Sequence, residues 1–163
     1  MGKAGFKLFI NLSIMLWIIF PLLLVPSCTL PKIIILEDKL TAEQHNDLGY
    51  VYETKGMDDL AGKEYNLALK KRGDWITPMF NMGNLFFRKG DYSTSELYFR
   101  KVLKIDPANA DAMNNLANVL LMQRHCQEAN RMVDQAIKSS RKAEYLDTRE
   151  KIVEKQHGVY CID

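Results

Sequence analysis

The sequence is poor in the residues that interrupt regular structure. Its 163 residues include 5 prolines and 9 glycines, too few for a low-complexity chain. Motifs of catalysis are also missing: the sequence has no Gly-rich phosphate loop, no nucleophile motif beside a base, and no paired carboxylates on a rigid turn. With 47% hydrophobic and 26% charged residues, the chain can form one modest domain with a core. We therefore expect a globular protein that is not an enzyme.

An excess of charge of one sign is missing as well. The formal net charge is +2, and Lys3 and Lys7 account for it, because the remaining 20 basic residues balance 20 acidic ones. No basic stripe interleaved with aromatic residues is present. Both absences argue against nucleic acid as a partner.

The first 27 residues contain no acidic side chain. Lys3 and Lys7 precede an apolar run from Leu8 to Val25 that only three residues interrupt, which is the layout of a signal sequence. Positive charges ahead of the run keep the N-terminus inside, so the rest of the chain would face the extracytoplasmic side. An uncleaved inner-membrane anchor stays open as the alternative, since about 18 apolar residues approach the length of a span.

The apolar run ends in Leu24-Val25-Pro26-Ser27-Cys28. This segment resembles the lipobox of bacterial lipoproteins, with an aliphatic residue three before the cysteine and a small residue directly before it. The resemblance implies that Cys28 is acylated and becomes the new N-terminus. Thr29, where an Asp would signal retention at the inner membrane, implies an outer-membrane lipoprotein facing the periplasm. More than one acyl chain makes such an attachment durable, at ~0.8 kcal/mol per buried CH₂.

A repeat of 34 residues fills the middle of the chain. Leu48-Gly49-Tyr50-Val51-Tyr52 returns as Met82-Gly83-Asn84-Leu85-Phe86 and again as Leu116-Ala117-Asn118-Val119-Leu120. A unit of this length is a helix–turn–helix that cannot bury its own apolar face and must stack on copies of itself. One frame without insertions gives units 42–75, 76–109 and 110–143.

Small and bulky residues recur at fixed offsets in this frame, as in helices whose side chains interdigitate. Gly56 and Gly90 stand in the turns inside the first two units, where glycine can adopt the left-handed conformation that ends a helix. Unit three has Arg124 there. The small column midway along each first helix, where a side chain would hold the second helix away, consists of Gly49, Gly83 and Ala117.

These recurring columns resemble those of tetratricopeptide-repeat proteins over residues 42–143. The resemblance implies an all-α fold, an α-solenoid of three helix–turn–helix units. Residues 144–156 predict one further helix with a polar back, which we expect to cap the third unit. Residues 28–41 would be a tether and residues 157–163 a tail.

The resemblance also implies a binding surface, the concave face made by the first helix of each unit. Amides there could pair with both donors and acceptors of a peptide backbone, and aromatic rings could supply apolar area. Asn84 and Asn118 have a second interpretation, because they match a common residue of the family. The candidate groove residues are Asn46, Tyr50, Phe80, Asn81, Asn84, Phe87, Asn114, Asn118 and Leu121.

One class of ligand is disfavoured. Chaperone-binding members of the family hold a C-terminal carboxylate with Lys, Asn and Arg at set positions. Only Asn81 fits that pattern, and Asp111 would repel a carboxylate. The five corresponding residues in this chain are Asn46, Tyr50, Asn81, Asp111 and Asn115.

Four side chains towards the C-terminus are of metal-binding types: His125, Cys126, His157 and Cys161. A capping helix alongside unit three would bring Cys161 towards Cys126. In an oxidising compartment two such cysteines more often form a disulfide than bind zinc, while a zinc site and two unpaired thiols stay open. We predict no metal site and no cofactor.

Together these features predict a lipid-anchored periplasmic interaction module, a scaffold or assembly factor for an envelope complex such as a pilus or secretion apparatus. A protein or peptide would occupy the concave face. The alternative is a non-catalytic partner of an envelope papain-like peptidase, because residues 40–45 faintly resemble the repeat region attached to such enzymes. Self-association through the open end of the stack is a third, weaker alternative.

Overall fold

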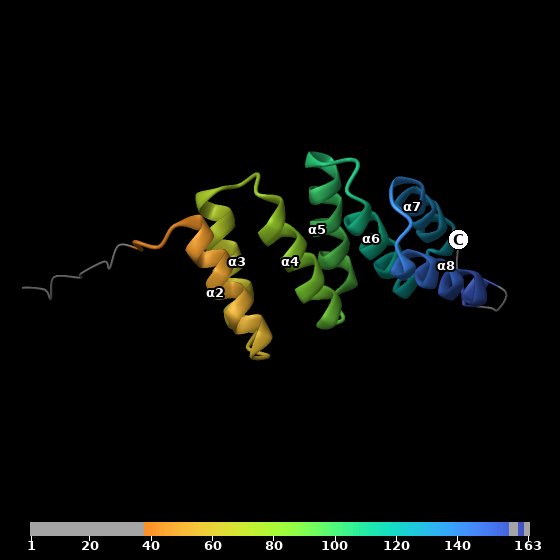
Figure 1. The fold of residues 1–163 in the computed structure, drawn as a ribbon. Helices are drawn as coiled ribbons and strands as arrows, with labels where there is room; N and C mark the ends of the chain where they lie inside the picture. The colour runs from red at the N-terminus through yellow and green to blue at the C-terminus, as the bar shows by residue number, and fades with distance from the viewer. Residues whose placement is uncertain (1–37, 157–159, 162–163) are drawn as a thin grey trace, which may run out of the picture. The chain divides into compact units, whose positions relative to one another are not determined.

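The computed structural model describes residues 38–156 and 160–161. The predicted signal sequence, Cys28, most of the tether and His157 lie outside the described residues. Within the described ranges all regular structure is α-helical, which confirms the predicted all-α repeat fold (Figure 1). No helix in these ranges is both long and apolar enough to cross a bilayer.

The helices follow the 34-residue frame. Each repeat consists of two helices, and the further helix α8 spans Ala143–Gln156, against a prediction of 144–156. The pairs are α2 (Ala42–Thr54) with α3 (Asp58–Lys71), α4 (Ile76–Arg88) with α5 (Tyr92–Ile105), and α6 (Ala110–Met122) with α7 (Cys126–Ser139).

Side-chain caps explain where several of the helices begin. Thr41 and Gln44 form a capping box at α2: the Gln44 backbone N–H donates to Thr41 Oγ1 at 3.2 Å, and the Thr41 N–H donates to Gln44 Oε1 at 2.8 Å. Asp91 caps α5 and Asn109 caps α6 in the same way, each accepting a backbone N–H three residues later. Caps of this kind are each worth about 1 kcal/mol.

The three internal turns share one backbone conformation. Gly56, Gly90 and Arg124 have φ values of 70°, 76° and 71°. The following N–H closes each turn on the carbonyl five residues earlier, as His125 N does on Leu120 O at 2.9 Å. Arg124 therefore adopts the conformation that glycine adopts in the other units, at a steric cost of roughly 1–2 kcal/mol.

The small column permits the close approach that the sequence predicted for it. A Cβ atom added at Gly83 would lie 2.8 Å from the ring of Phe99, and one added at Gly49 would lie 2.6 Å from the ring of Tyr65. Both rings are fully buried. The second helix of each of these units thus packs against the first through an aromatic ring over a glycine.

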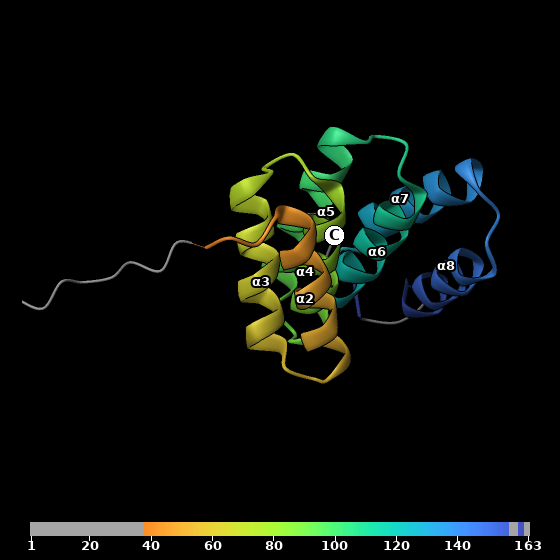
Figure 2. The same cartoon turned by 60° about the vertical axis from the view of Figure 1, so that its left-hand side comes forward.

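The first helices of neighbouring units contact one another, whereas the Cα atoms of α3 and α5, and those of α5 and α7, stay more than 8 Å apart. The first helices therefore line one side of the row, which we call the inner face, and α8 continues it by contacting both α6 and α7 (Figure 2). Tyr145 and Ile152 of α8 are fully buried in the same core as Phe99 and Leu116. Helix α8 caps the third unit as predicted.

Candidate functional site

The inner face has two hollows at which candidate residues meet. The smaller, of about 210 Å³, lies between α4 and α6 and includes Phe80, Asn81 and Asp111 in its lining. The larger, of about 350 Å³, reaches from α4 to α8 and includes Asn84, Phe87 and Asn118 with Phe99 at its base. Five of the nine predicted groove residues therefore line hollows on this face.

Three side-chain hydrogen bonds, which we call the amide bridges, connect neighbouring helices along the inner face: α2 with α4, α4 with α6, and α6 with α8. Asn81 Nδ2 donates to Asn46 Oδ1 at 3.3 Å. Asn115 Nδ2 donates to Asn84 Oδ1 at 2.9 Å. Asn118 Nδ2 donates to Thr148 Oγ1 at 3.2 Å. These asparagines thus hold neighbouring units together, in addition to any contact with a ligand.

Three of the predicted groove residues are not open to a ligand, and the prediction is wrong for them. Asn46, Asn114 and Leu121 are only 8%, 6% and 7% exposed. Asn46 is engaged by Asn81 of the next helix, and Leu121 belongs to the core that also contains Tyr145 of α8. Asn114 Oδ1 is buried and has no donor among the described residues.

The aromatic candidates differ in how they are presented. Tyr50 is 61% exposed and stands in the same column of the repeat as Asn84 and Asn118. Phe80 is half-buried and meets the ring of Phe99 edge-on, with centroids 5.5 Å apart. Phe87 is also half-buried and packs against the ring of Tyr92, with the ring centroids 5.7 Å apart. Tyr50 offers the largest free apolar area of the three.

An ionised carboxylate, paired with a lysine, lies at the smaller hollow. The carboxylate of Asp111 accepts hydrogen bonds from Lys142 Nζ at 2.6 Å and Tyr145 Oη at 2.5 Å. These two donors hold the pKa of Asp111 below its usual value. Burial first, and the bond to Asp111 second, raise the pKa of Tyr145, so the phenol stays protonated as a donor. A ligand carboxylate would meet a carboxylate here that is charged at neutral pH.

A second network joins the first two units. Glu53 accepts hydrogen bonds from Tyr65 Oη at 2.5 Å and from Arg88 Nη1 at 2.7 Å. Burial, followed by the bond to Glu53, raises the pKa of Tyr65 well above its ordinary value. The same arginine reaches Asp58 at 3.4 Å. Three helices, α2, α3 and α4, are thereby connected at one end of unit one.

The predicted groove omitted three residues that the structure places at its larger hollow or in its bridges: Asn115, Thr148 and Lys151. For Asn115 the signal was present, because it stands 34 residues after the selected Asn81. Thr148 and Lys151 belong to α8, outside the repeat frame, so no column pointed to them.

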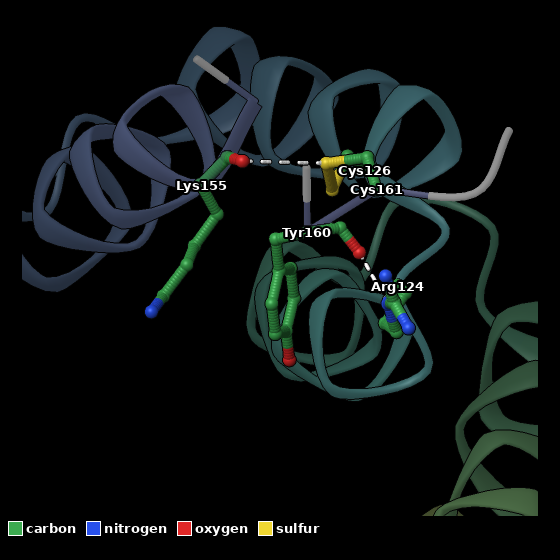
Figure 3. Close-up of a disulfide and its surroundings, with 5 residues drawn as sticks. All are labelled: Arg124, Cys126, Lys155, Tyr160 and Cys161. Atoms are coloured by element: carbon green, nitrogen blue, oxygen red, sulfur yellow. Dashed lines mark hydrogen bonds between the residues drawn. A yellow bond between two sulfur atoms is a disulfide. The ribbon is translucent and has the colours of Figure 1, made fainter. Parts of the chain in front are cut away.

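The C-terminal end of the described chain is fastened to the turn of unit three. Cys126 and Cys161 form a disulfide with their Cα atoms 5.7 Å apart, one of the arrangements that the sequence left open (Figure 3). Arg124 Nε donates to the carbonyl oxygen of Tyr160, and its guanidinium lies 5.5 Å from the centre of that ring. These contacts hold the left-handed Arg124. Among the described residues no three His, Cys, Asp or Glu side chains are grouped to hold a metal.

Known proteins similar to the chain are helical-repeat proteins. The chain is 34% identical over 77 residues, 47% of its length, to human Tetratricopeptide repeat protein 6, and spans 15% of that relative. The first TPR of Spaghetti (RPAP3), solved bound to the HSP90 peptide SRMEEVD, superposes with a TM-score of 0.70 at 15% identity, covering 76% of this chain and 99% of that one. The N-terminal domain of stress-induced protein-1 from C. elegans gives 0.62 at 17% identity, covering 69% and 94%.

At these identities the two solved structures show a shared fold. The sequence evidence for a family comes from residues 77–161, which match the family described as the TT21 fifth ARM repeats domain. This range covers the second and third units, α8 and the disulfide-bonded Cys161. The chain therefore belongs to the tetratricopeptide-type helical-repeat family, in the branch described by the TT21 fifth ARM repeats domain.

Proposed function

We propose that this protein is an interaction module that binds a peptide segment of another protein on its inner face. The observation that carries the proposal is the pair of inner hollows, in which half-buried amides and aromatic rings meet along the first helices. Polar side chains at fixed positions and exposed apolar area beside them suit an extended or helical peptide. The family relationship supports this use, since such repeats are typically binding modules.

The charges on the inner face restrict the class of peptide that can bind there. Asp111 already engages Lys142 and Tyr145, so these two donors are not available to the carboxylate of a peptide, and the carboxylate of Asp111 disfavours a second one beside it. The Spaghetti structure holds the acidic HSP90 peptide SRMEEVD. We propose a different ligand for this chain, an internal segment without an acidic end, with an apolar side chain against Tyr50 or Phe87.

A photo-crosslinking amino acid tests the location of binding. We would incorporate it in place of Tyr50 on the inner face and, as the matched control, in place of Leu97, which is 52% exposed on α5. Irradiation in native membranes should crosslink one defined partner from position 50 and not from position 97. A partner crosslinked from position 97 and not from position 50 would contradict binding on the inner face.

We further propose that the module acts as a scaffold or assembly factor in the cell envelope, held at the outer membrane and facing the periplasm. The support is the N-terminal sequence: a basic start, an apolar run, and Cys28 behind Val25 and Ser27. The similarity to the human and C. elegans proteins says nothing about cellular location. The proposed location therefore rests on these N-terminal residues alone. Acyl chains on Cys28 would supply the anchor.

Metabolic labelling with a palmitate analogue tests the anchor. Wild-type protein should incorporate the label and lack residues 1–27 by mass spectrometry, and Cys28→Ser should incorporate none. Cys161→Ser serves as the control for loss of a different cysteine and should label like wild type. Unlabelled wild-type protein that retains residues 1–27 would instead support the membrane-anchor alternative.

A further inference from the structure

A second, larger depression lies on the side of the stack away from the inner face. It has a volume of about 610 Å³ and is lined by residues of α3, α5 and the loop between α3 and α4, with Met79 of α4. A neighbouring hollow of about 540 Å³ continues it between α3 and α4, and Asn66 and Lys70 line both. We call the larger of the two the outer crevice.

The repeat frame explains why this crevice is open. In unit two, Arg100 pairs with Glu96 on its own helix and reaches Glu128 on α7, both at 2.7 Å. This arginine spans the gap between the second helices of units two and three. At the junction between units one and two the corresponding residues are Gly62, Asn66 and Thr94. None of these carries a charge, so α3 and α5 lack an ion pair like the one that joins α5 to α7. The ion pairs of the earlier junction run to the end of α4 instead, as Lys89 does with Asp59 at 2.7 Å.

The floor of the outer crevice is apolar. Leu69, Met79 and Tyr98 line it, and Ile105 at its edge is 44% exposed. The exposed isoleucine and the open apolar floor lie side by side, and an apolar side chain of a partner would cover both.

The rim is basic. Its lining includes three lysines, Lys70, Lys101 and Lys104, and one carboxylate, that of Asp74. Lys70 and Lys104 stand in the last turn of their helices, where a cation also complements the helix C-terminus. Lys101 lies earlier, with its ammonium 4.8 Å from the centre of the Tyr98 ring. Lys70 and Lys104 form no ion pair with any of the described residues, so their charge is available to a ligand.

From this arrangement we propose that the outer crevice binds an acidic peptide segment that inserts bulky apolar side chains between α3 and α5. Carboxylates of the segment would face Lys70, Lys101 and Lys104, and its apolar side chains would cover Leu69 and Tyr98. The site is separate from the inner face and does not depend on it. The crevice selects the negative charge that the inner face disfavours at Asp111, so one chain could hold two different segments at once.

Fluorescence anisotropy with three synthetic twelve-residue peptides tests the proposal on the full chain in non-ionic detergent. The first has Leu at every third or fourth position and Glu elsewhere, the second has Lys for each Glu, and the third has Ser for each Leu. We expect the first to bind, and the other two to bind at least tenfold more weakly. Absence of binding by the first peptide up to roughly 1 mM, or equal binding by the second or third, overturns the proposal.

Charge-reversal variants locate the binding. The double variant Lys70→Glu with Lys104→Glu should weaken binding of the first peptide at least tenfold. Lys138→Glu is the matched control, because Lys138 stands in the same repeat column on α7, and it should change binding less than twofold. A benzophenone version of the peptide should crosslink wild-type protein within α3, α5 or the loop between α3 and α4, or at Met79. Crosslinks confined to α2 or α6, or equal loss in the control, overturn the proposal and leave the inner-face binding test unaffected.

Discussion

Replacing Phe99 by alanine is expected to lower the free energy of unfolding by about 3–5 kcal/mol, as for other fully buried aromatic residues. Phe99 is fully buried, lies over Gly83 and meets Phe80 edge-on. Its removal opens a cavity at the centre of the second unit, because a glycine opposite cannot move a side chain in to fill it. The loss should appear as a lower midpoint in urea unfolding followed by circular dichroism.

Leu97→Ala is the control for this substitution. Leu97 stands two residues earlier on α5 and is 52% exposed, so its truncation should change stability by less than about 0.5 kcal/mol. Both variants introduce alanine, which is at least as good a helix former as phenylalanine or leucine. Neither variant should therefore lose stability through helix propensity. If the two variants unfolded at the same denaturant concentration, the contact between Phe99 and Gly83 would not be a determinant of stability.

Loss of the disulfide is expected to have the second large effect. Cys126 and Cys161 are separated by 35 residues, and closing a loop of that length stabilises the folded state by roughly 4 kcal/mol through the entropy of the unfolded chain. Cys161→Ser is the better variant, because Cys126 is fully buried and a hydroxyl there would add a second penalty. Oxidised wild-type protein should therefore unfold at a clearly higher urea concentration than Cys161→Ser.

A reducing agent provides the internal check. Under full reduction wild-type protein and Cys161→Ser should unfold together, since neither has the bridge. Cys28→Ser should behave as wild type in both conditions. A difference between wild type and Cys161→Ser that persisted after reduction would assign the stability to the cysteine side chain instead of the bond.

The architecture could be predicted from sequence because the repeat provides three independent observations of each column. Helix bounds follow the frame closely, and the reason predicted for the glycine column agrees with the short distances at Gly49 and Gly83. Arg124 shows where local preference is overridden. Its residue type does not favour φ of 71°, yet the packing of unit three and the contacts to Tyr160 hold it there.

The candidate site was less predictable. Tyr50 and Phe87 could be selected because the repeat frame places each of them on the first helix of its unit. The burial of Leu121 and Asn114 could not, because unit three has no following repeat and is covered by α8, whose register the frame does not determine. Whether two asparagines bond to each other or face solvent depends on the spacing between helices, which no single column encodes.

The amide bridges have a mechanical consequence. They tie the units at every junction on the inner side, so spreading the first helices apart requires a hydrogen bond to break each time. On the outer side Arg100 and Glu128 tie the later junction, and the uncharged Asn66 and Thr94 stand at the earlier one. Arg88 and Lys89 at the end of α4 also tie unit two to unit one, but they do not join α3 to α5. Under an applied load we therefore expect the second helices to separate more easily between α3 and α5 than between α5 and α7. The gap between α3 and α5 is also the place where the outer crevice would widen or narrow.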